Sequence, residues 1–239
     1  YIHINKRGIS KMTIMVDQGG GGDSFEQLSP GNYQATCYKI VDVGTSMEEF
    51  KGEVNKRTSL YLFFETPDVK TSNGQPMSIF NKYTKSLNEK SKLRQHLQQW
   101  RSRPFTDEEL SGFDMQNILG VSCTIEVVDN ANGNAKVKGV YAAEGGSKKT
   151  PTHNDCVVFD LEEYCKEFSG ESSAQSKKMC DVFEELPRFM KSAIIGDEDE
   201  GKKGCFEYLD AVEKGQGQIV EDKPKPKADE PFVDDDIPF

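Results

Sequence analysis

Hydrophobic and polar residues alternate with a period of two in three early segments of the chain. After the turn signal Pro30-Gly31, this pattern predicts strands over residues 32–43, 59–65 and 77–84. In the second strand Leu60, Leu62 and Phe64 share one side, whereas the other side is mixed. We therefore expect one face of a sheet to bury these three side chains. A polar loop rich in Glu, Lys and Gly is predicted between the first two strands.

The spacing of apolar residues changes to three and four in the segment that follows. Leu93, Leu97 and Trp100 would lie on one face of a helix over residues 89–100. Pro104 ends that helix, because proline cannot continue the hydrogen-bond pattern of a helix interior. The helix is therefore predicted as an insert between two groups of strands.

A capping-box signature then opens a second, shorter helix. Thr106 is followed three residues later by Glu109, so each side chain can accept from the backbone N–H of the other residue. Two β-rich runs return over residues 121–128 and 134–142. Three strands, a helical insert and two strands are the order of the OB-fold.

The predicted fold class is mainly β with helices. Residues 29–150 would form a five-stranded Greek-key OB barrel with a helical insert between strands three and four. An SH3-like or other small five-stranded barrel is the alternative, and the helix between strands three and four favours the OB-fold.

Residues 151–196 are predicted to form a helical annex packed on the barrel. A short apolar run at 157–159 precedes one predicted helix, 161–168, and one or two more over 179–195, interrupted by Pro187. The apolar residues of this last segment are Phe183, Leu186, Phe189, Met190 and Ile194. The same apolar face could lie on a second subunit, which leaves a homodimer possible.

Composition distinguishes the ends of the chain from its body. Hydrophobic residues make up 35% of the chain, below the ~45–50% usual for a globular domain. A flexible lead is expected over residues 1–28, with a possible true start at Met12, and a disordered acidic segment over 197–239. No apolar run reaches the ~18 residues of a membrane span. We expect a soluble, cytoplasmic protein without a membrane partner.

The charge of the chain is unevenly distributed. Residues 1–150 carry 19 basic and 17 acidic side chains, net +2, and residues 151–239 carry 11 and 23, net −12, which together give −10. Within the first part, residues 76–105 hold seven bases and one acid, Glu89. This asymmetry indicates a polyanion site on the body and an acidic interaction tail, although a solvated helix face is the simpler alternative.

Motifs for catalysis or metal binding are not recognisable. The six cysteines form no Cys-x-x-Cys pair and have no His at ligand spacing, so free thiols are expected, with Cys37 and Cys123 as small core residues. Phosphate-binding loops, zinc-protease motifs and nucleophile elbows are missing from the sequence. We expect no cofactor, no metal and no enzymatic activity.

Aromatic and basic residues are combined as single-stranded nucleic acid requires. Bases stack on exposed rings while a basic groove follows the phosphates. Phe80 is the strongest candidate, because it shares the non-core side of its strand with Lys82. Trp100 is assigned to the core, since it belongs to the helical series. The candidate DNA-binding residues are Tyr38, Lys56, Arg57, Tyr61, Phe63, Phe80, Lys82, Lys85, Lys90, Lys92, Arg94, Arg101 and Arg103.

The last residues carry the most specific signal. The C-terminal sequence Asp-Asp-Asp-Ile-Pro-Phe resembles the acidic tip of bacterial single-stranded DNA-binding proteins, which docks replication, recombination and repair enzymes. A terminal ring can fill a pocket while its carboxylate and the acidic residues meet a basic rim. The resemblance implies a helicase, nuclease, polymerase or primase as partner. The docking residues would be Asp234, Asp235, Asp236, Ile237, Pro238 and Phe239.

The body resembles a different group, the OB-fold single-stranded DNA-binding proteins of tailed phages. The resemblance lies in the strand opening at 31–35 and in the segment 85–94 followed by Trp100, Pro104 and Phe105. It implies a phage protein that coats single-stranded DNA during replication, recombination and repair. The alternatives are a strand-annealing or recombination-mediator protein, and an adaptor that captures host enzymes through its tail without binding DNA.

Overall fold

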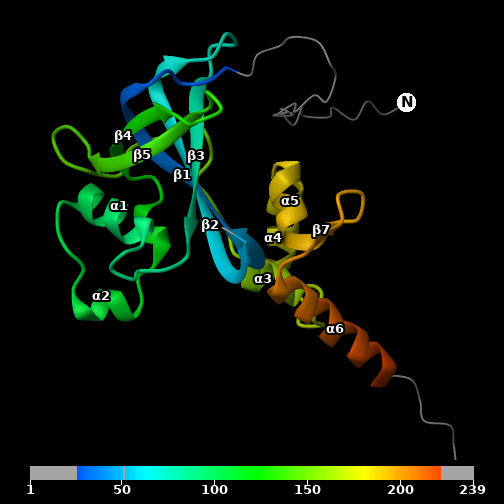
Figure 1. The fold of residues 1–239 in the computed structure, drawn as a ribbon. Coiled ribbons are helices and arrows are strands. Elements are labelled where there is room, and N and C mark those ends of the chain that lie inside the picture. The colour runs from blue at the N-terminus through cyan, green and yellow to red at the C-terminus, as the bar shows by residue number, and fades with distance from the viewer. Residues whose placement is uncertain (1–25, 51, 222–239) are drawn as a thin grey trace, which may run out of the picture.

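A computed structural model describes residues 26–50 and 52–221 as a mixture of strands and helices. A six-stranded sheet stands at the centre, with α1 and α2 on one side and α3 to α6 on the other (Figure 1). The strands of this sheet are β1 (Gly31–Phe50), β2 (Glu53–Lys70), β3 (Pro76–Thr84), β4 (Ser122–Asp129), β5 (Ala135–Ala142) and β6 (Val157–Phe159). The helices are α1 (Lys92–Arg101), α2 (Asp107–Ser111), the 3₁₀ helix η1 (Met115–Ile118), α3 (Leu161–Lys166), α4 (Ala174–Glu184), α5 (Arg188–Ile195) and α6 (Phe206–Glu221).

The sheet has the strand order β3-β2-β1-β4-β5, in which neighbours are antiparallel, and β6 pairs with β1 in parallel. Within the described residues no ladder joins β3 to β5, so the sheet is open between its two end strands. The helices α1 and α2 lie between β3 and β4 in sequence, as the helical periodicity predicts. Ser91 caps α1, and the capping box of Thr106 and Glu109 opens α2.

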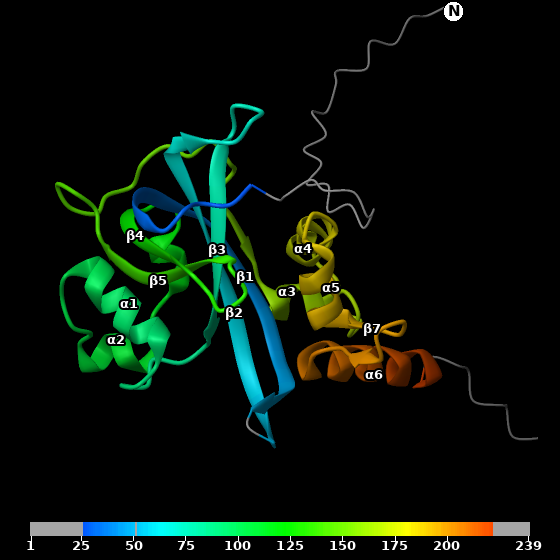
Figure 2. The same ribbon diagram turned by 45° about the horizontal axis from the view of Figure 1, so that its top comes forward.

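The loop predicted between the first two strands is wrong. Strand β1 continues to Phe50 and pairs with β2 from Glu53, which forms a long ribbon (Figure 2). Its outer part carries polar pairs, such as the Thr45 and Thr58 hydroxyls 2.8 Å apart. The described residues 45–49 and 53–58 of this part are exposed or half-buried, so its sequence lacks the apolar alternation that predicts a strand.

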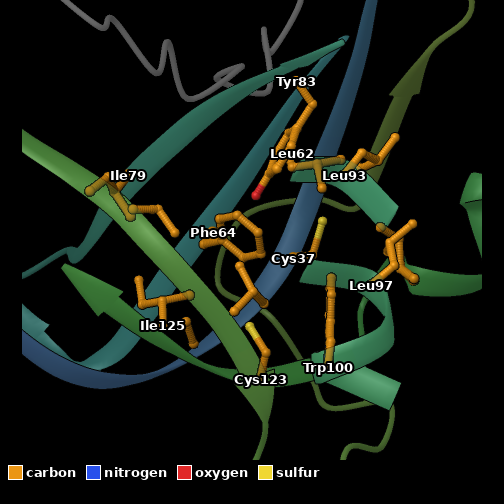
Figure 3. Close-up of a cluster of buried hydrophobic side chains, with 14 of the residues drawn as sticks. Cys37, Leu62, Phe64, Ile79, Tyr83, Leu93, Leu97, Trp100, Cys123 and Ile125 are labelled. Carbon is orange, nitrogen blue, oxygen red and sulfur yellow. The ribbon is translucent and has the colours of Figure 1, made fainter. Parts of the chain in front are cut away.

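One face of the sheet is closed by α1. Leu93, Leu97 and Trp100 of α1 are each at most 3% exposed and meet the side chains of β2, including Phe64 (Figure 3). The Trp100 indole N–H donates to the Ser122 carbonyl at 2.8 Å. Trp100 is therefore a core residue, as the helical series predicts.

The opposite face of the sheet is covered by the annex and α6. Tyr61 and Phe63 of β2 form a second core with residues such as Phe159, Met190 and Ile194, and these last three are fully buried. Figures 1 and 2 both show α4 and α5 beside this face. Residues of β2 near its centre are consequently buried on both sides of the strand.

The expectation of an unstructured segment from residue 197 is wrong as far as residue 221. A short hairpin of β7 (Gly196–Asp197) and β8 (Lys202–Lys203) leads into α6. The helix docks through few apolar residues: Ala211 is 5% exposed, and the Tyr208 ring lies 5.1 Å from that of Phe168, while Cys205, just before the helix, is fully buried. The sequence pattern did not predict this helix, because the segment has few apolar residues and its docking also depends on polar contacts.

Glu207 provides the main polar contact of α6. Its carboxylate accepts from the Thr45 backbone N–H at 2.8 Å and from the Thr45 hydroxyl at 2.6 Å. Gly44, with φ of +70°, makes room for this docking: a Cβ there would lie 2.5 Å from Leu161 and 2.6 Å from the Glu207 carboxylate. The ribbon, α3 and α6 therefore meet at this glycine.

Residues 26–28, expected to belong to a flexible lead, are part of the folded body. Leu28 is 4% exposed in the core, and the Glu26 carboxylate accepts from the Ser72 backbone N–H at 2.9 Å. Most of the lead and the C-terminal docking residues lie outside the described part of the chain. In the part that is described, no helix has the length and apolar character needed to cross a membrane.

Candidate nucleic-acid interface

Three of the four aromatic residues expected to present an open stacking surface are buried. Tyr38, Tyr61 and Phe63 are 7%, 9% and 8% exposed. They do lie on the non-core side of β1 and β2, as the alternation predicts, but the annex covers that side. These three rings therefore pack beneath the exposed surface and offer little accessible area on which a base could stack.

Phe80 is the exception and stands 43% exposed on β3. Its ring stacks against Phe189 of α5, with the centroids 5.5 Å apart and the planes inclined by 29°. Tyr61 meets both rings edge-on, with a centroid distance of 5.8 Å to each. Phe80 and Phe189 therefore form a half-exposed pair of rings held by buried aromatic neighbours.

The sequence pattern did not identify Phe189 as a candidate binding residue, because it assigned Phe189 to the core of the annex. It is 45% exposed, whereas Met190 and Ile194 of the same helix are fully buried. Leu186 just before α5 and Met190 and Ile194 within it form a buried stripe at a spacing of four, and Phe189 lies at its edge. The position of Phe189 outside this spacing could have indicated an exposed side chain from the sequence alone. Only the tertiary structure shows that Phe80 is the neighbour of Phe189.

One basic side chain, Lys82, lies beside the exposed rings, and a second, Arg57, shares its acidic partner. Lys82 follows Phe80 by two residues on the same side of β3, pairs across the ladder with Tyr61 and makes an ion pair with Glu48. Arg57 shares this carboxylate, with its Nε 3.4 Å from Glu48 Oε2. The two basic side chains are 43% and 44% exposed, so the pairs are weak and open to exchange with another anion.

The remaining predicted bases are dispersed rather than gathered in one groove. Lys85 pairs with Asp42 beside a cavity of 410 Å³ between the ribbon, α3 and α6. Lys56 lies over the Phe206 ring, 4.1 Å from its centre. Lys56 therefore contributes to the docking of α6 on the ribbon, whereas the ion pair of Lys85 joins the end of β3 to β1.

Arg101 and Arg103 meet at the C-terminal end of α1. Both pair with Glu109, and Arg103 Nη2 lies 2.8 Å from Glu109 Oε1. The backbone N–H of Thr106 and the two guanidinium groups lower the pKa of Glu109 to about 2. Arg101 also packs over Phe105, 4.5 Å from the ring centre. Its guanidinium stabilises the α1–α2 connection, while Arg103 remains exposed at the mouth of a 520 Å³ cavity.

The bases at the start of α1 have separate environments. Arg94 Nη1 donates to the Leu87 carbonyl at 3.2 Å, which fixes the loop before the helix. Lys90 and Lys92 are exposed. Lys92 reaches β5, where Lys136 lies close enough to affect its pKa. The basic run in sequence therefore divides into four places on the structure.

The cysteines are all free thiols. Cys37 and Cys123 are fully buried in the core that α1 closes, and burial raises the pKa of both. The described residues contain no group of three or more His, Cys, Asp or Glu side chains that could hold a metal ion.

Comparison with known proteins adds no relative. A scan against protein-family models finds no match, and searches among curated proteins and among solved structures find no similar protein. The function of this chain is therefore inferred from its own residues.

Proposed function

We propose that this protein binds single-stranded DNA without strong sequence preference. The observation that carries the proposal is the half-exposed pair Phe80 and Phe189 beside Lys82, whose partner Glu48 also pairs with Arg57. Every base has a π-face, so exposed rings bind bases in a sequence-tolerant way, and neighbouring cations attract phosphates. Bases in a duplex are already stacked, which favours a single strand.

The strand arrangement supports the same proposal. Both β2–β3 and β4–β5 are hairpins on either side of β1, and α1 lies between β3 and β4 in sequence. We propose that these five strands are an OB-type arrangement whose outer face, with β3, carries the ligand. In this chain the annex narrows that face to the rings of Phe80 and Phe189.

Glu48 occupies the site where a phosphate would lie. Its carboxylate neutralises Lys82 and Arg57 in the free protein. A DNA phosphate would take over these two cations and release condensed counterions, so affinity should fall steeply with salt. The protein would then be a coat protein for single strands in replication, recombination or repair.

The test is a fluorescence-anisotropy titration with labelled oligo-dT. Phe80→Leu and Phe189→Leu keep an apolar side chain but remove the ring. Because stacking contributes about 1–3 kcal/mol per base, each variant should bind roughly 5- to 150-fold more weakly. Leu209→Ala, at a position 42% exposed on α6, is the matched control and should bind like wild type. Equal affinity of wild type for oligo-dT and for duplex at low salt would refute the proposal.

We further propose that Asp234 to Phe239 recruit partner enzymes. The support is the sequence itself, in which three acidic residues precede an apolar end. Deletion of these six residues should abolish partner capture while leaving oligo-dT affinity equal or higher, since an acidic peptide competes with DNA for cations. Intact capture with no oligo-dT binding by the full chain would favour an adaptor function instead.

A further inference from the structure

A second basic surface lies where α1 meets β5, on the side of the sheet away from the annex (Figure 1). It is formed by Lys90 and Lys92 from α1 and the turn before it, and by Lys136 and Lys138 from β5; all four residues are exposed. We call these four residues the lysine seam. Lys92 and Lys136 are more than 40 residues apart in sequence. The basic run found by counting charges along the chain therefore included Lys90 and Lys92 but not Lys136 and Lys138.

The seam is fixed by hydrogen bonds between the helix and the strand. Lys92 Nζ donates to the Val137 carbonyl at 3.4 Å. His96 Nε2 donates to the Lys138 carbonyl at 3.0 Å, because a carbonyl can only accept. The other ring nitrogen of His96 therefore accepts from the Tyr83 hydroxyl, at 2.9 Å.

A β-bulge in β5 gives the seam its geometry. Glu126 pairs with Gly139 and Val127 with Val137, so Lys138 is the extra residue of the bulge. A bulge leaves one residue unpaired and bends the strand, and here it frees the Lys138 carbonyl for His96. Lys136 and Lys138 both remain on the exposed side, about 7 Å apart by the rise of an extended strand.

The seam carries more positive charge than its neighbours neutralise. Lys138 pairs with Glu126 at 2.7 Å, but within the described residues Lys90, Lys92 and Lys136 make no ion pair. Burial and the nearby Lys136 lower the pKa of Lys92. A polyanion would relieve this repulsion.

We infer that the lysine seam binds the phosphate backbone of single-stranded DNA, as a second contact region separate from Phe80 and Phe189. The inference rests on the proposed function. Exposed primary ammonium groups without aromatic partners suit phosphates and carry no base recognition. The seam therefore contributes affinity that is independent of sequence and sensitive to salt, while the ring pair contributes stacking.

The test compares the salt dependence of oligo-dT binding by wild type and by the triple variant Lys92→Gln, Lys136→Gln, Lys138→Gln. Each lost phosphate contact lowers the slope of log K against log salt by about 0.7 for single strands. The slope should therefore fall by about 2, with the same loss on oligo-dA. A triple change at exposed lysines of the annex and β8, Lys177→Gln, Lys178→Gln and Lys203→Gln, removes the same charge elsewhere and should keep the wild-type slope.

Two results would overturn the inference: a wild-type slope in the seam variant, or an equal fall in the control, which would indicate general electrostatic attraction. A thermal melt of both triple variants checks that each is folded at the assay temperature. Failure of the proposed function looks different, because wild type itself would then not bind oligo-dT. Phe80→Leu serves as a cross-check: it should weaken binding with an unchanged slope.

Discussion

On one face of the sheet, α1 covers Leu62 and Phe64 with a single amphipathic helix; on the other face, the annex and α6 cover Tyr61 and Phe63. The first core is mainly aliphatic around Trp100, and it is built from residues 28–140. The second is rich in aromatic rings and draws on residues up to 211. Both faces of the same strand, β2, are thus buried by parts of the chain that follow it.

The difference between the two cores shows how aromatic residues on the second face of a strand can be interpreted. Polar residues at alternate positions of a strand indicate a face that is exposed to solvent. Aromatic residues at those positions, such as Tyr61 and Phe63, indicate instead a face that is covered by a second layer or by a ligand. Here the annex covers Tyr61 and Phe63, whereas Phe80 and Phe189 stay half exposed and form the proposed binding site. The annex therefore limits the surface left for a base.

The largest expected effect tests whether the two faces unfold together. Phe64→Ala on the α1 face and Phe159→Ala on the annex face, both fully buried, should each lower the free energy of unfolding by about 3–5 kcal/mol. Trp100, the single tryptophan, reports the α1 face by fluorescence in urea, and far-UV circular dichroism reports the whole fold. If Phe159→Ala left the Trp100 transition unchanged, the two faces would be independent units.

Acid should weaken the α1 face selectively. Burial lowers the pKa of His96 to about 4 from an ordinary 6.5, so the neutral ring is the form that the fold stabilises. This contribution is complete above pH 6.5 and is lost as the pH falls toward 4, by about 1–3 kcal/mol. The difference in unfolding free energy between wild type and His96→Gln should therefore shrink over this range. Gln95→Ala, at an exposed position of the same helix, removes no titratable group and should give a difference that does not change with pH.

A substitution at Gly44 should weaken the annex face. Ala at a φ of +70° is strained, and its Cβ would collide with Leu161 and the Glu207 carboxylate. Backbone strain alone costs about 1–2 kcal/mol, and undocking of α6 adds to it. Gly74→Ala, with φ of +77° and no atom within 4 Å, carries only the strain. Equal losses of stability in urea for the two variants would show that α6 docking does not depend on Gly44.

The smallest effect on stability is expected at Glu48, the acidic partner of Lys82 and Arg57. Glu48→Gln removes two exposed ion pairs and should change the free energy of unfolding by no more than about 0.5 kcal/mol. It should nevertheless tighten oligo-dT binding several-fold, because Lys82 and Arg57 no longer have a competing carboxylate. Glu184→Gln, which releases Lys191 on the annex, should leave the affinity unchanged. Weaker binding by Glu48→Gln would mean that Glu48 orients these cations.

Local rules predicted the elements that depend on local chemistry. Thr106 with Glu109, the helical series ending at Trp100, and the strand around Phe64 all follow from spacing and capping, and the structure contains them. The ribbon beyond Gly44 and helix α6 were missed because partners far along the chain stabilise them, as Glu207 does at Thr45.

The candidate site was predicted in part for the same reason. Phe80 and Lys82 follow from alternation on one strand, but their neighbours Phe189 and Glu48 come from segments more than 30 residues away. The lysine seam likewise joins α1 to Lys136 and Lys138. Burial of Tyr38 depends on the annex, which no pattern within β1 reveals.

Strand β1 has a consequence for the order in which the chain matures during synthesis. It pairs with β2, with β4 and, at Val41, with Phe159 of β6. Ribosomes add about 5–20 residues per second, so the β1–β6 ladder must wait roughly 6–24 s after Val41 is made, since about 118 residues separate the two. During this interval the rings of Tyr61 and Phe63 lack the residues that bury them in the complete fold.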